Sequence, residues 1–525
     1  MKNKKKITSI FLMGLLLLVF LKIDYRFIES FTCCQDDHDY FMHAETIALD
    51  FDLDYTNQLA GYEEKRFSSN GKIAPKGFIG TGIFSSIFLY VGNLFEINDL
   101  KDNIFNYKIL FYSLSSVVYL FWGIFLFNTI IKDLKLKIHP MTVLILTSAT
   151  GLIYYSFERY SMTHVYEFFS TTLVIYFSHK FYKTNKNIYA FLVPIAIALA
   201  FSVRWVNYFI LFLPYITYSL FKTSYKKESL MKNNLFLVSS IFSFISFVYL
   251  NYSIYGSATL NPQFVYGTEK MASGYFANNN GLTAFLFENI SNLFKIVITQ
   301  EFGILYFSPL IFFASSYALF LIFSKKINTS TKIFLLISFI FVYGPVLLWK
   351  STASSYGFRY LLSSVSLCLI IFMHYKKYNE NKFVNYYLII ISLFSLLSIL
   401  FFETTLGTQL SLTEVSNSFD RQLRFSQPLY LSGLLESFFN LESYLKIFTT
   451  SFFGVFILKI VLTLFNIEEL NSFLGNLGLP VSNSDFQELL INLENISILK
   501  IFIVVVLIYL LVGYFYKNIK DYEKI

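Results

Sequence analysis

A dense cluster of carboxylates follows the first apolar segment of the chain. The cluster and two neighbouring histidines comprise Asp36, Asp37, Asp39, Glu45, His38 and His43. A carboxylate can act as a general base that takes the proton of an attacking hydroxyl. Carboxylates beside a bilayer cost solvation free energy, and they often mark a functional site. The competing interpretation is a solvated loop, and the residue types alone leave both open.

The composition indicates an integral membrane protein. Of the 525 residues, 55% are hydrophobic and 14% are charged. Apolar runs close to 20 residues recur, each long enough to cross roughly 30 Å of hydrocarbon. The expected fold class is therefore an all-α polytopic membrane protein. The net charge of +8 is explained by lysines that face anionic membrane lipid, so we expect no nucleic-acid partner.

Lysine-rich turns orient the chain. Lys2 to Lys6 precede the apolar segment 7–23, which predicts a retained anchor with a cytoplasmic N-terminus and an acidic cluster outside. The expected inner turns contain Lys132–Lys137, Lys180–Lys186, Lys222–Lys232, Lys325–Lys332 and Lys376–Lys382. These turns predict about 12 membrane helices (about 11–13), both termini inside and a plasma-membrane location. The segments are 7–23, 105–131, 141–156, 165–179, 188–203, 206–221, 235–255, 303–323, 333–349, 359–375, 384–402 and 498–516.

The same topology divides the chain into three regions. Residues 1–402 form the expected transmembrane catalytic domain, whose first outer loop is 24–104. Within that loop, Gly80–Phe95 is expected to lie at or dip into the outer interface. Residues 403–497 form a large outer region, and 498–525 form the last membrane helix and a tail. Segment 449–465 is either an interfacial helix or an additional span.

All seven arginines fall on the outer side, although lysine alone defined the inner side. Arginine recognises phosphate and carboxylate groups through planar, multidentate hydrogen bonding. Arg204 lies at the tip of an otherwise apolar hairpin, where it either reaches the lipid headgroups or faces a polar cavity. Arg159 and Arg359 lie at two other outer turns. A carboxylate base and a cationic cradle in one outer cleft would suit transfer to a hydroxyl from a phosphate leaving group.

Short motifs along the chain are similar to those of the GT-C glycosyltransferases, which use polyprenyl-phosphate-linked sugars. Asp36-Asp37-x-x-Tyr40 resembles their Asp-Glu-x-x-Tyr motif in the first outer loop. Phe302-Gly303-Ile304-Leu305-Tyr306-Phe307-Ser308-Pro309 resembles a Gly-Leu-Leu-x-Tyr-Ser-Pro signature, and Tyr356-Gly357-Phe358-Arg359-Tyr360-Leu361 resembles Tyr-Gly-Pro-Arg-Tyr-Leu. The class includes protein O-mannosyltransferases and aminoarabinose transferases. The resemblance extends from residue 1 to about residue 375.

The resemblance implies an inverting transfer on the outer face. A hydroxyl of a glycan, lipid or protein acceptor would attack the sugar, and the lipid phosphate would leave. Asp36 is the expected base, with Asp37 as the alternative because glutamate is more common at the second position. Arg204, Arg359 and Arg159 are the expected ligands of the donor phosphate. The expected substrate contacts are Tyr40, Glu45, His164, Tyr356 and Glu301.

Metal use and two other function classes stay open at this point. The first outer loop has oxygen and imidazole groups that could hold a divalent cation, Mg²⁺ or Mn²⁺. His38 and His43 do not share a helical face well, so the sequence leaves the requirement for an ion open. A transporter would place charges midway along its spans, whereas these lie at the outer ends. A polysaccharide polymerase or ligase would concentrate arginines in a late outer loop, and Arg421 and Arg424 lie in such a region.

Overall fold

The computed structural model describes most of the chain. The described residues are 2–22, 35–60, 70–96, 107–225, 230–262, 265, 281–298, 303–325, 327–349, 356–406, 434–435, 437–476, 487, 490–491, 493–494 and 497–522. Within these ranges the structure is helical, and the only β-type pairing is an isolated bridge between Lys22 and Ser451. The all-α fold class is thus confirmed.

The helices follow one another with short connections. The α-helices are α1 (Lys2–Phe20), α2 (Gln35–Glu45), α4 (Ile79–Glu96), α5 (Tyr107–Asp133), α6 (Pro140–Thr147), α7 (Ile153–Phe157), α8 (His164–Thr184), α9 (Asn187–Val203), α10 (Leu213–Leu220), α11 (Asn234–Tyr255), α14 (Gly281–Ile298), α15 (Ile304–Phe307), α16 (Pro309–Phe323), α17 (Thr329–Trp349), α18 (Val365–Tyr378), α19 (Lys382–Leu406), α22 (Leu441–Thr450), α23 (Phe452–Leu462), α24 (Ile467–Asn476) and α26 (Ile498–Tyr522). Short π and 3-10 turns are η2 (Thr46–Asp50), η3 (Ser148–Leu152), η4 (Tyr208–Phe212), η5 (Lys222–Ser224), η6 (Leu230–Lys232) and η7 (Arg359–Ser364).

The length and composition of the helices fit a polytopic membrane protein. In the described part of the chain, 7 helices are long and apolar enough to cross a membrane. Six of them coincide with segments expected from the sequence, and the other five described apolar helices are shorter. The seventh, Ile79–Glu96, is the segment that we expected at the interface. Length and composition thus allow α4 to span, and the count of about 12 stays a prediction.

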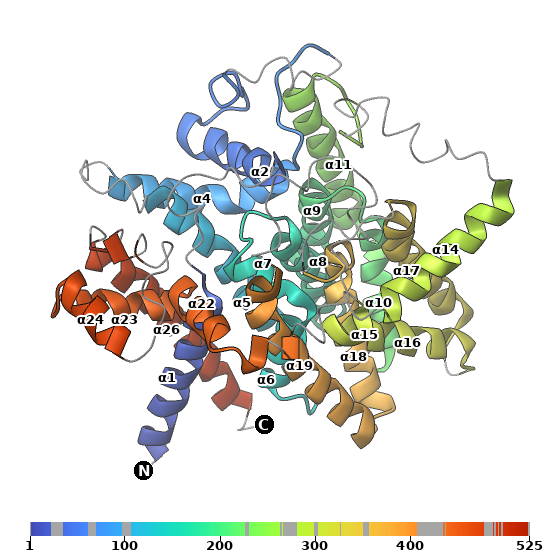
Figure 1. Ribbon diagram of the computed structural model, residues 1–525. Helices are drawn as coiled ribbons and strands as arrows, with labels where there is room; N and C mark the ends of the chain where they lie inside the picture. The colour runs from blue at the N-terminus through green and yellow to red at the C-terminus, as the bar shows by residue number, and fades with distance from the viewer. Residues whose placement is uncertain are drawn as a thin grey trace.

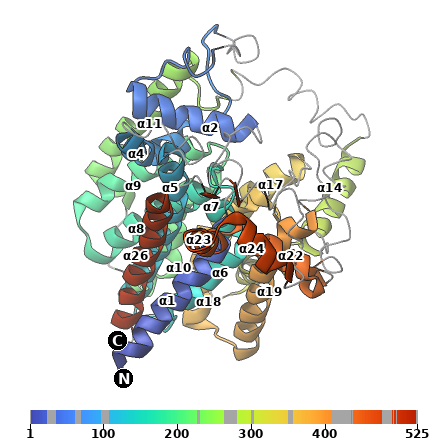
Figure 2. The ribbon, with the colours of Figure 1, turned by 60° about the vertical axis from the view of Figure 1, so that its left-hand side comes forward.

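The helices form a bundle with a transverse layer at one end. Both chain termini lie at one end, and α2 lies across the opposite end (Figures 1 and 2). In Figure 1, α4 runs across the direction of α1, which agrees with the interfacial interpretation of α4. The charged groups of α2 are thereby held against the bundle end that is remote from the termini.

Segment 449–465 is divided at Ser451. The hydroxyl of Ser451 caps α23 by accepting from the Gly454 amide at 3.1 Å, so α22 and α23 are separate helices. With 11 residues, α23 is about 16 Å long, which is too short to cross roughly 30 Å of hydrocarbon. This length favours the interfacial alternative over an additional span. The Phe452 amide donates to the Leu21 carbonyl at 2.7 Å, which ties α23 to the end of α1.

The helical segment 140–157 is interrupted, and two serines far along the chain donate hydrogen bonds to backbone carbonyls at the interruption. Gly151 has φ of 99°, a conformation that favours glycine and breaks the regular helix. Ser308 Oγ donates to the Thr150 carbonyl at 3.0 Å, and Ser395 Oγ donates to the Ala149 carbonyl at 2.7 Å. Irregular backbone at membrane depth requires such partners, because hydrocarbon offers none. The interruption therefore fixes the positions of α7, α16 and α19 relative to one another.

Candidate functional site

Glycines of α4 bring α2 and α9 to the same helix. A Cβ atom on Gly82 would lie 2.6 Å from the His43 backbone, and one on Gly80 would lie 2.3 Å from the Val203 amide nitrogen. Both contacts are shorter than a side chain permits, so only glycine allows this approach. The Asp37 end of α2 and the Arg204 end of α9 are thereby positioned by one element.

Asp37 forms a buried ion pair with Arg159. The Arg159 Nη2 group donates to Asp37 Oδ2 at 3.2 Å, and the Ser161 hydroxyl donates to Asp37 Oδ1. The Asp37 side chain is fully buried, and that of Arg159 is 12% exposed. Charge-assisted hydrogen bonds on both oxygens fix the orientation of this carboxylate. Two sequence-predicted residues therefore meet, and Ser161 is a partner that the sequence did not indicate.

Glu167 is the centre of a second buried network. Its carboxylate accepts from Arg204 Nη1 at 3.1 Å, from Asn207 Nδ2 at 3.2 Å and from the Thr163 hydroxyl. His164 Nδ1 lies 3.4 Å from the same carboxylate. The Glu167 side chain is fully buried, and that of Arg204 is 7% exposed.

Arg204 therefore faces the protein interior rather than the lipid headgroups. Burial of a guanidinium requires a counterion, and Glu167 supplies it. The sequence contained a signal for this pair, because Glu167 follows His164 by three residues on an outer helix end. Its partnership with Arg204, from a different helix, was not readable from that spacing.

Tyr360 joins two of the predicted phosphate ligands. The guanidinium carbons of Arg204 and Arg359 lie 4.6 Å and 5.0 Å from the centre of the Tyr360 ring. Arg359 Nη2 also donates to the Tyr360 hydroxyl at 3.1 Å. Guanidinium groups on an aromatic face gain cation–π attraction, and stacking limits their rotamers. The arrangement holds two cations on a common ring, where they can serve one anion.

The turn between α7 and α8 links the two networks. Arg159 and Ser161 bind Asp37, while Thr163 binds Glu167. Between them, the Met162 sulfur lies 3.7 Å from Arg359 Nη1. This turn therefore brings the acid from α2 into the same cluster as Arg204, which follows α9, and Arg359, which begins η7.

Of three further sequence-predicted substrate residues, only His164 has a described contact with this cluster, through Glu167. Tyr40 is buried, and its ring stacks on Phe78 with centroids 6.5 Å apart. Burial raises the pKa of Glu45, and Asp50 adds to that effect. His164 is buried against Tyr155, with ring centroids 4.6 Å apart. Their roles in substrate binding stay predictions, and the structure places His164 closest to the arginines.

Tyr356 is held deep in the bundle. It is 1% exposed, its hydroxyl donates to the Ser395 carbonyl at 3.1 Å, and its own carbonyl accepts from Tyr155 at 3.2 Å. The Phe307 ring contacts it edge to face at 5.9 Å. The two late motifs of the sequence thus meet at the interrupted segment 140–157, where Tyr356 and Ser308 position Arg359 and Tyr360 through packing.

Two predicted site groups lie outside the described part of the structure. These are the side chain of Asp36 and the whole of Glu301, and the late arginines Arg421 and Arg424 also lie outside it. Among the described residues, no group of three or more His, Cys, Asp or Glu side chains is arranged to hold a metal ion.

No protein-family model, curated protein or solved structure matches the chain. The chemistry that the cluster could perform is therefore inferred from its own side chains. It combines a fixed carboxylate, two arginines on one aromatic ring and a buried glutamate that neutralises one of them. Such a set can bind a phosphate through the remaining guanidinium donors and can hold a hydroxyl beside a carboxylate.

Proposed function

We propose that this protein is an integral membrane glycosyltransferase that moves a sugar from a polyprenyl-phosphate-linked donor to a hydroxyl acceptor. The observation that carries the proposal is the convergence of Arg204 and Arg359 on Tyr360, one short turn from the Asp37–Arg159 pair. Arginine pairs favour phosphate, and the apolar helices around them favour a lipid carrier. The GT-C-like motifs include Asp37, Arg359 and Tyr360 of this cluster, which supports this class of donor.

The transfer step uses these groups in defined roles. The acceptor hydroxyl oxygen forms a bond to the anomeric carbon while its proton passes to a carboxylate. The bond between that carbon and the phosphate oxygen breaks, and its electron pair leaves with the lipid phosphate. Arg204 and Arg359 stabilise the negative charge that develops on this oxygen. Both oxygens of Asp37 are already bound, so Asp37 orients the site and Asp36 is the candidate base.

Removal of the base tests the proposal directly. Cells that lack the gene are complemented with the wild-type protein, Asp36→Asn or Asp37→Asn, and their glycans and lipid-linked sugars are compared by mass spectrometry. We expect the deletion strain to lack one sugar and to accumulate its lipid-linked form. Asp36→Asn should lower turnover by about 10²- to 10⁴-fold without loss of donor binding. Unchanged glycans and lipid-linked sugars in the deletion strain would refute the proposal.

The matched control for this experiment is an exposed acid of the same loop. Asp54 is exposed, and its carboxylate bonds only to the nearby Thr56 among the described residues. Asp54→Asn should therefore keep full turnover. Asp39 lies closer to the motif, but it is 1% exposed and would confound activity with folding. Full turnover in Asp36→Asn would remove Asp36 as the base. Loss of turnover in Asp37→Asn would then assign the base to Asp37 if that variant folds and binds the donor as the wild type does, because Asp37 also pairs with Arg159.

Arg204→Lys tests the phosphate role. Lysine keeps the positive charge but cannot reproduce the planar guanidinium that spans Glu167 and the Tyr360 ring. We expect at least about a tenfold loss of kcat/KM, since one charge-assisted hydrogen bond contributes about 1.5–3 kcal/mol. Wild-type kcat/KM in this variant would remove Arg204 from the donor site.

We also propose that the lysine-rich turns face the cytoplasm and the arginine cluster faces outward. In a background with Cys33 and Cys34 replaced by serine, a membrane-impermeant thiol reagent should label Asn57→Cys in intact cells. Asn185→Cys, in the turn after α8, should react only after the cells are opened. The opposite labelling pattern would reverse the orientation and place the cluster inside the cell.

A further inference from the structure

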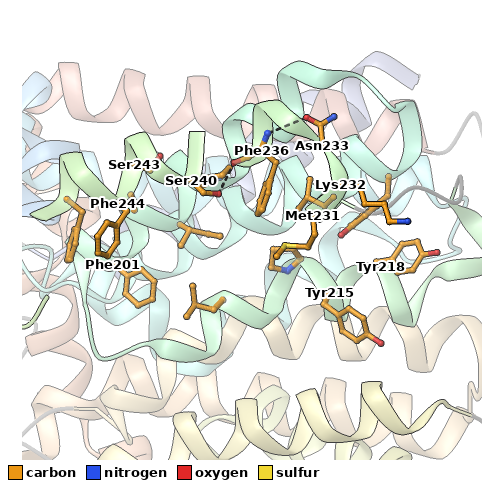
Figure 3. A pocket seen from close by; sticks show the side chains of 18 of the residues that line it. Phe201, Tyr215, Tyr218, Met231, Lys232, Asn233, Phe236, Ser240, Ser243 and Phe244 are labelled. Carbon is orange, nitrogen blue, oxygen red and sulfur yellow. Dashed lines mark hydrogen bonds between the residues drawn. The ribbon is translucent and has the colours of Figure 1, made fainter. Parts of the chain in front are cut away.

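A long groove lies between α9, α10 and α11, away from the arginine cluster. Its volume is about 1100 Å³, at the upper end of the range for small-molecule sites. Phe201, Phe244 and Phe247 line one end, and Lys222 and Lys232 line the other. Figure 3 shows Phe201, Ser243 and Phe244 together at one end and Lys232, Asn233 and Tyr218 together at the other. The groove thus has an apolar end and a basic end.

At the basic end, Lys222 and Lys232 have no carboxylate partner among the residues that the structure describes. No aspartate or glutamate is among the described residues that line the groove. Within the described part of the chain, neither Lys222 nor Lys232 forms a side-chain ion pair, and both are exposed. Two ammonium groups at one mouth, neither paired with a described carboxylate, favour an anionic ligand. The Tyr215 and Tyr218 rings beside them have the amphipathic character of side chains at a membrane surface.

The groove is long enough to hold an acyl chain from one leaflet of a bilayer. Along α11 the lining extends from Asn233 to Phe247, which corresponds to about 21 Å of helix. One leaflet contributes roughly 15 Å of hydrocarbon, so a chain that enters beside the lysines ends near the phenylalanines. The outer face of α11 is exposed at Ile241, Phe242 and Phe244, so the groove borders the surface that faces lipid.

The basic end belongs to the side of the bundle with the other lysine-rich turns. Lys377 Nζ donates to Ser224 Oγ at 2.6 Å, and the hydroxyls of Thr223 and Tyr378 lie 3.0 Å apart. The turn after α10 and the turn after α18 therefore lie together. This places the groove mouth in the leaflet opposite the arginine cluster.

We propose that this groove binds one anionic phospholipid, with its phosphate at Lys222 and Lys232 and one acyl chain along α11 toward Phe201. Charge selects the headgroup, and the apolar wall holds the chain. Anionic lipids are enriched where lysines face the membrane, and basic pockets between membrane helices bind such headgroups. Binding would hold α9, α10 and α11 together, and α9 ends directly before Arg204.

Native mass spectrometry of the purified full-length protein tests the proposal. The probes are phosphatidylglycerol and phosphatidylcholine with identical acyl chains. We expect phosphatidylglycerol to bind up to about thirtyfold more tightly, because each lysine near a membrane surface contributes a factor of roughly five. Lys222→Gln/Lys232→Gln should abolish this preference. The control Lys132→Gln/Lys137→Gln, in a basic turn outside the groove, should keep it.

A variant in the apolar wall separates a groove site from general surface attraction. Ala198 lines the groove, and Ala198→Phe should lower the affinity for both lipids several-fold by filling the chain channel. Equal binding of the two lipids to the wild type, or an equal effect of both lysine pairs, would overturn the proposal. Tighter binding of a polyprenyl phosphate that depends on Lys222 and Lys232 would also overturn it and would make the groove a donor path.

Discussion

The replacement of Glu167 by glutamine should destabilise the protein strongly, although it changes only one atom of the side chain. Glutamine removes the negative charge that lies 3.1 Å from Arg204 Nη1, where the two side chains are 0% and 7% exposed. Loss of one partner of a buried ion pair costs about 3–5 kcal/mol, because the other charge stays in a low-dielectric site. Glutamine also presents an amide donor near Asn207 Nδ2, which itself donates to Glu167. We therefore expect a loss of about 3–4 kcal/mol in the free energy of unfolding.

The assay is equilibrium unfolding in mixed micelles of mild detergent and sodium dodecyl sulfate, monitored by intrinsic fluorescence. The matched control is Glu380→Gln, which breaks the pair of Lys376 and a carboxylate that is 49% exposed. Exposed pairs contribute about 0.2–1 kcal/mol, so this control should change little. A double variant, Glu167→Gln with Arg204→Met, completes the cycle. We expect a coupling free energy of at least about 1 kcal/mol between the two sites.

Two outcomes would refute this reasoning. One is a cost of Glu167→Gln that does not exceed the cost of Glu380→Gln, which would mean that the pair is hydrated. The other is additivity of the two single changes within about 0.5 kcal/mol, which would mean that Glu167 and Arg204 do not interact. Either outcome would also weaken the assignment of Arg204 to a buried anion site.

Two further predictions concern the packing and the acid response of the bundle end that contains α2. Gly80→Ala should lower the free energy of unfolding by about 3 kcal/mol and should lower turnover, because its Cβ would lie 2.3 Å from the Val203 amide beside Arg204. The control is Gly344→Ala, whose Cβ meets nothing within 4 Å and which should be neutral or stabilising by up to about 1 kcal/mol. Equal stability of the two variants in the same unfolding assay would contradict the close approach of α4 and α9. Burial lowers the pKa of His43 from 6.5 to about 4, with a hydrogen bond to the Gly77 carbonyl in partial opposition. As the pH falls, His43 binds a proton in the unfolded chain before it does so in the folded protein. Its contribution to the free energy of unfolding is therefore fully present above about pH 6.5 and is lost as the pH falls toward 4, by up to about 3 kcal/mol. Unfolding measured against pH should show a steeper loss of stability between about pH 6.5 and 4 in the wild type than in His43→Gln. Identical slopes in the two proteins would refute a buried neutral histidine.

The apolar runs in the sequence were sufficient to predict the all-α fold class. Apolar runs of about 20 residues favour helices, which satisfy their own backbone hydrogen bonds, and the regular secondary structure in the described part is helical. The number of membrane spans was harder to predict from the sequence. The apolar run of α4 is long enough to cross a membrane, yet α4 also packs closely against α2 and α9 through its glycines. Hydropathy measures composition along one segment and does not register such contacts.

Lysine placement in the sequence predicted that the acids of the first loop and the arginines would share one side of the bundle, and that orientation stays a proposal. Only the tertiary structure decided which charges meet. Asp37 and Arg159 are 122 positions apart, and Glu167 and Arg204 are 37 positions apart, so no spacing rule links them. Their pairing depends on the glycine contacts of α4 and on the turn between α7 and α8. A buried charge must find its counterion in three dimensions, and that requirement is invisible in a linear pattern.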